Sequence, residues 1–219
     1  MGCASRRLGR PDQEAHARGY LRVCGLDEVG RGPLAGPVVA AAVVLSPGTE
    51  IPGLDDSKRL GPAARARLEP AIRSAAVDFA LAVASPAEID ALNILQASLL
   101  AMGRAVAGLS EPPDFLLVDG NRPVPSPLPQ RTVVGGDGLS TAIAAASVLA
   151  KQYRDALMEE YGRVHPGYGF EIHRGYPTPE HREALRRLGP CPLHRRSFRG
   201  VCTPSPPLSQ LDLFPPGNL

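Results

Sequence analysis

The chain has no tryptophan, and aromatic residues make up only 5% of its 219 residues. Alanine, valine and leucine must therefore fill the core of a protein whose apolar content, 43%, is ordinary for a globular domain. No run of about 18 apolar residues is present, so we expect no membrane-spanning helix. The N-terminus also lacks the apolar stretch of a secretory signal, which favours a cytoplasmic protein.

Paired cysteines are missing as well. The four cysteines, at positions 3, 24, 191 and 202, form no CxxC pair, which argues against a zinc site or a dithiol redox centre. Free thiols in a cytosolic chain are the simpler interpretation.

Excess charge is also lacking, because the formal net charge is only +2. The distribution is uneven, however. Residues 151–200 hold ten Lys or Arg against six Asp or Glu, together with four of the five histidines. Phosphate binding needs local rather than global positive charge. This segment therefore suits either a nucleic-acid contact or a solvated basic surface.

Apolar periodicity and turn signals predict alternating strands and helices, and hence an α/β fold with a mixed sheet. Ser85 and Pro86 are a typical helix start, and the long Ala-rich helix is expected to break near Ser147. The expected strands are 21–27, 38–45, 78–84, 115–118 and 131–134, and the expected helices are 62–75, 93–108, 139–161 and 179–188.

The length favours one domain with appendages. We expect a flexible N-terminal tail over residues 1–20, one folded domain over 21–202, and a disordered Pro-rich tail over 203–219.

Acidic residues follow three of the predicted strands: Asp27 with Glu28, Asp119, and Asp137. Mg²⁺ and Mn²⁺ prefer carboxylate oxygens, and four carboxylates suffice to hold two ions about 4 Å apart for attack on a phosphodiester. Asp27 and Glu28 are neighbours, so they share a site only if the strand twists or ends there. Acids at strand ends are also ordinary turn residues, and the pattern alone leaves both interpretations open.

Longer motifs carry a family resemblance. The stretch LDEVGRGPLAGPV at 26–38 closely resembles the opening motif of type 2 ribonucleases H (ribonuclease HII), and further matching motifs follow in the same order over roughly residues 21–200. They are DSK at 56–58, LNILQ at 92–96, VDGN at 118–121, GGD at 135–137, AASVLAK at 145–151 with Arg154-Asp155, HP at 165–166, HRGY at 173–176, and HR at 194–195 with Ser197-Phe198.

The resemblance implies a ribonuclease H-like fold: a mixed five-stranded sheet flanked by helices, with a C-terminal helical extension. It implies an acidic active site with Mn²⁺ or Mg²⁺, cleavage of RNA–DNA hybrids and of duplex DNA with embedded ribonucleotides, and 5′-phosphate and 3′-hydroxyl products. Ribonucleotide excision repair and primer removal are implied too. The sequence does not determine the oligomeric state, and a monomer is the default expectation. The implied catalytic and metal-binding residues are Asp27, Glu28, Asp119 and Asp137.

Type 3 relatives carry a sizeable extra N-terminal domain and lack the arginine of the Gly-Arg-Gly turn. Here only about 20 residues precede the first expected strand, and Arg31 is present. Type 2 is therefore preferred.

The turn Gly30-Arg31-Gly32 is the candidate sensor of the 2′-hydroxyl, because glycines let the backbone approach a ligand closely. A tight turn that needs glycine only for a positive φ is the alternative. Tyr176 is similar to the family tyrosine that packs on the deoxyribose after the scissile ribonucleotide; it could equally be a half-buried residue covering its loop.

Four further residues are candidate phosphate contacts: Lys58, Lys151, Arg195 and Ser197. For each, a solvated surface residue is an equally good interpretation. Histidines 165, 173, 181 and 194 are spaced by 8 to 13 residues, which fits no common metal motif, so structural or phosphate-facing roles are favoured.

The C-terminal sequence QLDLF resembles the short peptide that bacterial replication proteins insert into the β sliding clamp. A Pro-rich tether would present its apolar side chains as docking anchors, unless the match is accidental or the segment folds back. The clamp-binding candidates are Gln210, Leu211, Asp212, Leu213 and Phe214.

Two other functions stay open at this point. The fold also hosts DNA-cutting integrases and junction resolvases, and a non-catalytic hybrid-binding module would keep the same surface. The Gly-Arg-Gly turn with Tyr176 argues against the first, and four intact acids argue against the second.

Overall fold

The computed structural model describes residues 8–54 and 60–201. A five-stranded mixed sheet lies at its centre, in the order β3-β2-β1-β4-β5. The strands are Val23–Val29 (β1), Val38–Leu45 (β2), Ala76–Ala84 (β3), Phe115–Asp119 (β4) and Gln130–Val133 (β5). β1 pairs with β2 and β2 with β3 in antiparallel fashion, whereas β1, β4 and β5 run parallel. The predicted α/β class and mixed five-stranded sheet are confirmed.

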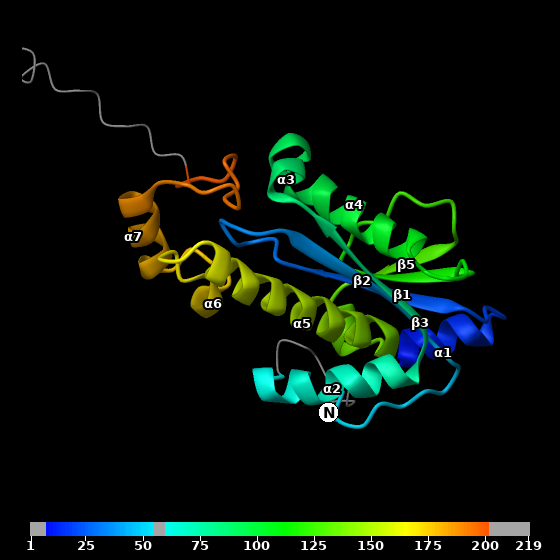
Figure 1. Ribbon diagram of the computed structural model, residues 1–219. Coiled ribbons are helices and arrows are strands. Elements are labelled where there is room, and N and C mark those ends of the chain that lie inside the picture. Colours follow the sequence, from blue (N-terminus) through cyan, green and yellow to red (C-terminus); the bar gives the residue numbers. More distant parts are fainter. Residues whose placement is uncertain (1–7, 55–59, 202–219) are drawn as a thin grey trace, which may run out of the picture.

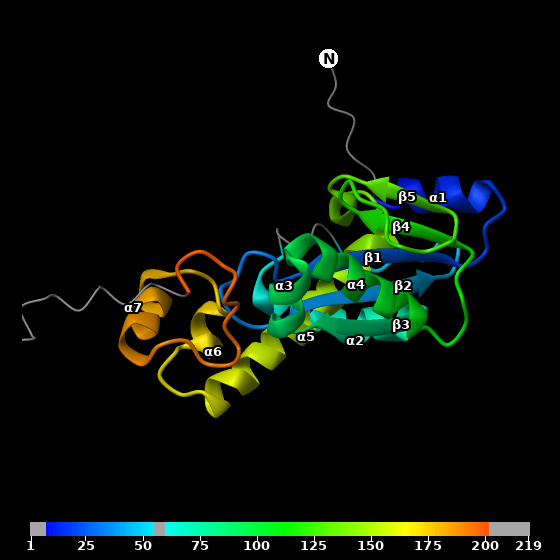
Figure 2. The same cartoon turned by 90° about the horizontal axis from the view of Figure 1, so that it is seen from above.

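Helices cover both faces of the sheet (Figure 1). α4 lies on one face with α3, and α5 lies on the other with α2. The short helices α6 and α7 lie beyond one end of the sheet (Figure 2). The helices are Arg10–Ala17 (α1), Pro62–Ala75 (α2), Pro86–Leu92 (α3), Ile94–Ala107 (α4), Thr141–Val164 (α5), Phe170–His173 (α6) and Pro179–Leu188 (α7), with a 3-10 turn at Gly136–Gly138 (η1). None of the helices in these described ranges is long and apolar enough to cross a membrane.

β2 explains why two layers of helices are needed. All eight of its residues are buried, and its side chains alternate between the core beside α4 and the core beside α5. A strand buried on both faces shows no polar alternation, as the sequence indicated. The strand therefore has to lie inside the sheet with helices on both sides.

The close approach of α5 to β1 depends on Gly25. A Cβ at this position would lie 2.2 Å from the backbone carbon of Ala142, so only glycine lets the start of α5 rest on the strand. α5 then runs along β1 toward the acidic end of that strand. The predicted break near Ser147 is wrong, because α5 is continuous. Its Ala-rich first half is buried against the sheet, and alanine has the highest helix propensity.

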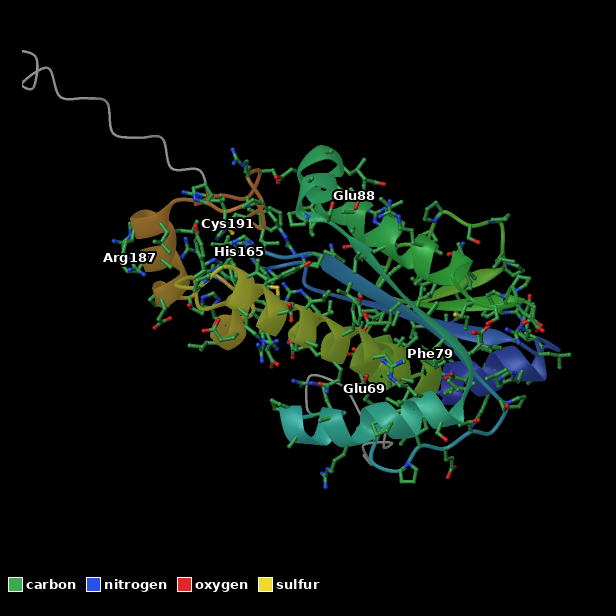
Figure 3. All side chains as sticks on the ribbon, in the orientation of Figure 1. Glu69, Phe79, Glu88, His165, Arg187 and Cys191 are labelled. Carbon is green, nitrogen blue, oxygen red and sulfur yellow. The ribbon has the colours of Figure 1, made fainter. Side chains whose placement is uncertain are left out.

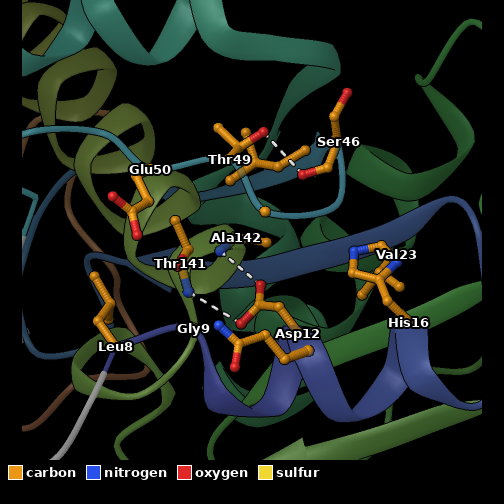
Figure 4. Close-up of a pocket in the computed structure, with 13 residues that line it drawn as sticks. Leu8, Gly9, Asp12, His16, Val23, Ser46, Thr49, Glu50, Thr141 and Ala142 are labelled. Atoms are coloured by element: carbon orange, nitrogen blue, oxygen red, sulfur yellow. Dashed lines mark hydrogen bonds between the residues drawn. The ribbon is translucent and has the colours of Figure 1, made fainter.

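Residues 10–17 form helix α1, so the predicted flexible tail over residues 1–20 is wrong for this part. Asp12 ties the helix down: its carboxylate accepts hydrogen bonds from Ser140 Oγ and from the amides of Thr141 and Ala142, at 3.0 to 3.1 Å. These amides begin α5 and have no partner within the helix. Asp12 lines a small pocket at this helix start, with a volume of about 90 Å³. Figure 4 shows Asp12 beside Thr141 and Ala142. The pocket contains none of the predicted site residues.

Candidate active site

The strand ends bring Asp27 and Asp119 together. Leu26 of β1 pairs with Val118 of the parallel strand β4, so the next residue of each strand, an aspartate in both cases, stands beside the other. Both aspartates line a cavity of about 560 Å³. Parallel strands place their carboxyl ends at one edge of a sheet, where the scaffold is rigid and the loops are open.

Glu28 reaches the same cavity from the other face of β1. Its carboxylate also lines a second cavity of about 280 Å³ beside α4, whereas Asp27 faces α5, where the Ser147 hydroxyl is its hydrogen-bond partner. Strand alternation therefore holds. The two acids share a site because β1 continues beyond its last pairing with β4 at Leu26. Asp119 lines both cavities and joins them.

Burial and mutual repulsion make these carboxylates costly to ionise. Burial raises the pKa of Asp27 well above its usual range, and the charges of Asp119 and Glu28 raise it further. The pKa of Glu28 is also raised by burial, against the opposing effect of Arg31, whose guanidinium lies 3.1 Å from the Glu28 carboxylate. Like charges in a buried site are relieved by a cation. The donor set therefore fits a hard divalent ion.

The carboxylates are not drawn together as a finished metal cage. Among residues 8–54 and 60–201, no three His, Cys, Asp or Glu side chains form a group that could hold an ion as they stand. Glu28 is engaged with Arg31, and Asp119 Oδ1 accepts the Gly136 amide at 2.7 Å. Electrostatic repulsion between the carboxylates also keeps these side chains apart. A bound cation would have to pull these side chains inward.

Asp137 lies on η1, directly after Gly136, and is buried with 2% of its surface exposed. It does not line the cavity that holds the other three acids. The hydrogen bond from the Gly136 amide to Asp119 nevertheless fixes its turn next to them. The structure thus brings three of the predicted acids together and puts the fourth beside them.

The rest of the cavity wall contains most of the predicted substrate residues. Gly30, Arg31 and Gly32 form one side, and Lys151 of α5 and Tyr176 form another. A Cβ on Gly32 would lie 3.7 Å from the Tyr176 ring, so the turn and the tyrosine are direct neighbours. The Lys151 ammonium donates to Asp155 at 2.6 Å.

The sequence analysis did not predict two polar side chains of the cavity wall. Arg65 of α2 is largely buried, with only 9% of its surface exposed, and yet lines the cavity. Ser147 also lines it and forms a hydrogen bond with Asp27. Arg65 resembles an ordinary helix-surface arginine in its Ala-rich sequence, so no local signal could have found it. Ser147 lay in a recognised motif but carried no assigned role.

The predicted phosphate contact of Arg195 is wrong. Its side chain has no exposed surface, so it cannot touch a phosphate. Its guanidinium instead donates to the carbonyls of Gly30, Arg31 and Gly36. Ser197 is exposed, but its hydroxyl donates to Asp90 at 2.6 Å and it does not line the cavity. Lys58 and residues 210–214 lie outside the described residues.

Three of the four histidines, at positions 173, 181 and 194, form a packed cluster away from the acidic cavity. His181 and His194 are buried and meet through their Nε2 atoms at 3.1 Å, and the His173 ring stacks on His181 at 4.4 Å. Cys191 lies in the same cluster, 3.2 Å from His194 Nδ1. Figure 3 places Cys191 and His165 at the end of the molecule that carries α6 and α7.

Comparisons with known proteins agree on one family. The family model described as Ribonuclease HII matches residues 24–201. The chain is 57% identical over 190 residues to the ribonuclease HII of Syntrophotalea carbinolica, which covers 87% of this chain and 91% of that protein.

Solved structures share the fold. The ribonuclease H2 of Pyrococcus horikoshii superposes with a TM-score of 0.70 at 25% identity, over 83% of this chain and 95% of that one. The ribonuclease HII of Archaeoglobus fulgidus, solved in a complex with PCNA, gives a TM-score of 0.69 at 23% identity over 89% and 100% of the two chains. A Bst ribonuclease HIII in complex with Mn²⁺ gives a TM-score of 0.63 at 22% identity, over 85% of this chain and 70% of that one. The last two likenesses concern the fold alone.

Proposed function

The chain belongs to the ribonuclease HII family, and we propose that it is a metal-dependent endonuclease that hydrolyses the RNA strand of RNA–DNA hybrids. It also cuts on the 5′ side of ribonucleotides embedded in duplex DNA, and leaves 5′-phosphate and 3′-hydroxyl ends. The observation that carries the proposal is one cavity lined by Asp27, Glu28 and Asp119 together with the Gly30–Gly32 turn.

The acids are the proposed ligands of Mg²⁺ or Mn²⁺. Asp27, Glu28 and Asp119 supply oxygens from one cavity, and Asp137 supplies a further carboxylate from the adjoining turn. When bound, such ions activate water and neutralise charge on the phosphodiester. The raised pKa of Asp27 favours this assignment, because a cation replaces the proton that burial otherwise promotes.

The remaining wall residues bind and orient the nucleic acid. Arg31 and Gly32, the exposed residues of the Gly30–Gly32 turn, approach the ribose, and Tyr176 beside Gly32 offers a ring face at the RNA–DNA junction. The Lys151 ammonium and the Arg31 guanidinium add positive charge next to the acids, so they can attract the phosphate backbone.

Residues 21–202 are assigned to the catalytic domain, to which α1 adds a packed helix. The sequence of residues 203–219, which lie outside the described residues, carries a motif for the β sliding clamp. The enzyme acts in the cytoplasm as a monomer, in ribonucleotide excision repair and primer removal, where Cys24 and Cys191 stay reduced.

One assay tests the proposal. A duplex with a single ribonucleotide, labelled on either strand, is incubated with Mg²⁺, with Mn²⁺ or with EDTA. We expect cleavage of the ribonucleotide strand only, on its 5′ side, and only with a divalent ion. Equal cleavage of an all-DNA duplex would favour an integrase- or resolvase-like nuclease, and binding without turnover in either ion would favour a non-catalytic module.

A further inference from the structure

One buried side chain, that of Arg195, binds the Gly30-Arg31-Gly32 turn from the protein interior. Three hydrogen bonds run from its guanidinium to backbone carbonyls: Nη2 to Gly30 at 2.6 Å, Nη1 to Arg31 at 3.0 Å, and Nε to Gly36 at 2.9 Å. The planar guanidinium of arginine can hold several acceptors at fixed angles, which lysine cannot do. Two successive carbonyls of the turn are thus fixed on the protein side.

Arg195 is itself firmly positioned. Its amide donates to the Leu34 carbonyl at 2.9 Å, and the preceding residue, His194, forms an isolated β-bridge with Ala35. The guanidinium carbon lies 5.0 Å from the centre of the Phe198 ring. A segment that is 165 residues away in sequence therefore sets the shape of the turn.

Fixing the carbonyls also fixes the amides. In a trans peptide the N–H of a residue points opposite to the carbonyl of the residue before it, and the described residues contain no cis bond. With the Gly30 and Arg31 carbonyls bound to Arg195, the amides of Arg31 and Gly32 point away from it. Both residues are exposed and line the acidic cavity, and neither amide donates to an acceptor within the described part of the chain.

We propose that Arg195 is the positioning residue for recognition of the 2′-oxygen: it aims the amides of Arg31 and Gly32 at that atom without touching substrate. A ribose hydroxyl oxygen has two lone pairs and can accept both N–H groups, whereas deoxyribose offers no acceptor there. This inference rests on the proposed function, because it requires an RNA-containing duplex in the cavity.

Arg154 provides a matched control. It is also fully buried, and its guanidinium donates to the carbonyls of Ala35, Pro37 and Arg174. None of these carbonyls belongs to the turn. Arg154 packs against Gly30 mainly through Nε and Cδ, and a lysine keeps the Cδ methylene there. Arg154→Lys therefore removes a comparable buried guanidinium without freeing the turn carbonyls.

The test measures binding without turnover. Fluorescence anisotropy in EDTA compares a duplex that carries one ribonucleotide with the same duplex made of DNA. The wild-type protein should prefer the ribonucleotide duplex by about 5- to 10-fold, as expected for one or two net hydrogen bonds. Arg195→Lys should bring this preference below about twofold with unchanged affinity for the DNA duplex, and Arg154→Lys should retain it.

Each outcome decides the matter. A folded Arg195→Lys protein that keeps the full preference overturns the inference, and so does an equal loss in Arg154→Lys, which would mean general loosening. If Arg195→Lys fails to fold, Phe198→Leu removes the ring against the guanidinium and should lower the preference roughly two- to fivefold; an unchanged value overturns the inference.

The wild-type protein separates this inference from the proposed function. Strand-specific cleavage without an ion-free preference overturns only the role of Arg195. Absence of strand-specific cleavage overturns the proposed function itself.

Discussion

Asp27 and Asp119 stand side by side at the ends of two parallel strands, and the Asp119 charge raises the pKa of the buried Asp27 carboxyl. The pair is therefore unfavourable for the folded chain in the absence of a cation. Above the pH at which Asp27 ionises in the unfolded chain, its charge lowers the stability of the folded protein. Such an arrangement is expected where function rather than stability selects the residue.

Asp27→Asn should separate activity from stability. Loss of a charged ligand should lower the cleavage rate by at least about 10²-fold, while removal of the repulsion should raise the melting temperature in EDTA at pH 7.5. Asp119→Asn should be similarly inactive, and Asp137→Asn less severely so. Asp114→Asn is the control, because Asp114 only accepts the Leu21 and Arg22 amides at the far end of β4. Near-normal turnover in folded Asp27→Asn would refute the metal-site assignment.

Tyr176→Ala should affect one substrate more than another. The ring is 40% exposed at the cavity and lies beside Gly32. Loss of stacking worth roughly 1–3 kcal/mol should slow cleavage at a lone ribonucleotide about 5- to 150-fold, and cleavage of a long hybrid much less. Tyr176→Phe keeps the ring and should behave like the wild type. Equal losses on both substrates would mean that Tyr176 only supports its loop.

Asp12→Ala should destabilise the protein without abolishing catalysis. Asp12 joins α1 to the first amides of α5, and loss of such a cap costs roughly 1–2 kcal/mol. Urea denaturation measures the change. Gln13→Ala is the control, because Gln13 lines the same pocket. A variant as stable as the wild type would show that α1 contributes nothing through this contact.

Stability should fall as the pH falls from about 6.5 toward 4. Burial lowers the pKa of His194 from 6.5 to about 4, and burial lowers the pKa of His181 as well. The unfolded chain then takes up protons before the folded one does, so the contribution present above pH 6.5 is lost, on the order of 2 kcal/mol. Denaturation midpoints at pH 8, 6 and 4.5 test this. His194→Gln should have a lower denaturation midpoint at pH 8 than the wild type, but its midpoint should fall less as the pH is lowered. An equally steep fall would assign the effect to other groups.

Removal of residues 208–219 should leave cleavage of free oligonucleotides unchanged and abolish binding to the cognate sliding clamp. Leu211, Leu213 and Phe214 are the proposed anchors, and tethering would raise the local enzyme concentration on new DNA. Fluorescence polarisation of a labelled 205–219 peptide measures the interaction, with Leu211→Ala/Phe214→Ala as the control peptide. No measurable binding of the intact peptide would end the proposal.

Local sequence was sufficient for most elements. The helices 62–75 and 179–188 and the strand 38–45 have the predicted bounds, because a start signal or an unbroken apolar run marks each of them. Ser85 caps α3 in a full capping box with Glu88. The first strand begins two residues later than predicted, and α5 continues to Val164 without the expected break. Both differences reflect tertiary packing.

The sequence by itself determined the family, the order of the elements and the acids at the strand ends, because these depend on residue type and short-range spacing. Only the tertiary structure decided which residues face the cavity. It placed Arg65 in the wall, put Arg195 beneath the turn rather than on a phosphate, and docked α1 on α5. The physical reason is that burial and hydrogen-bond partners arise from contacts between segments up to 165 residues apart, and no local pattern encodes which carbonyl a distant arginine will meet.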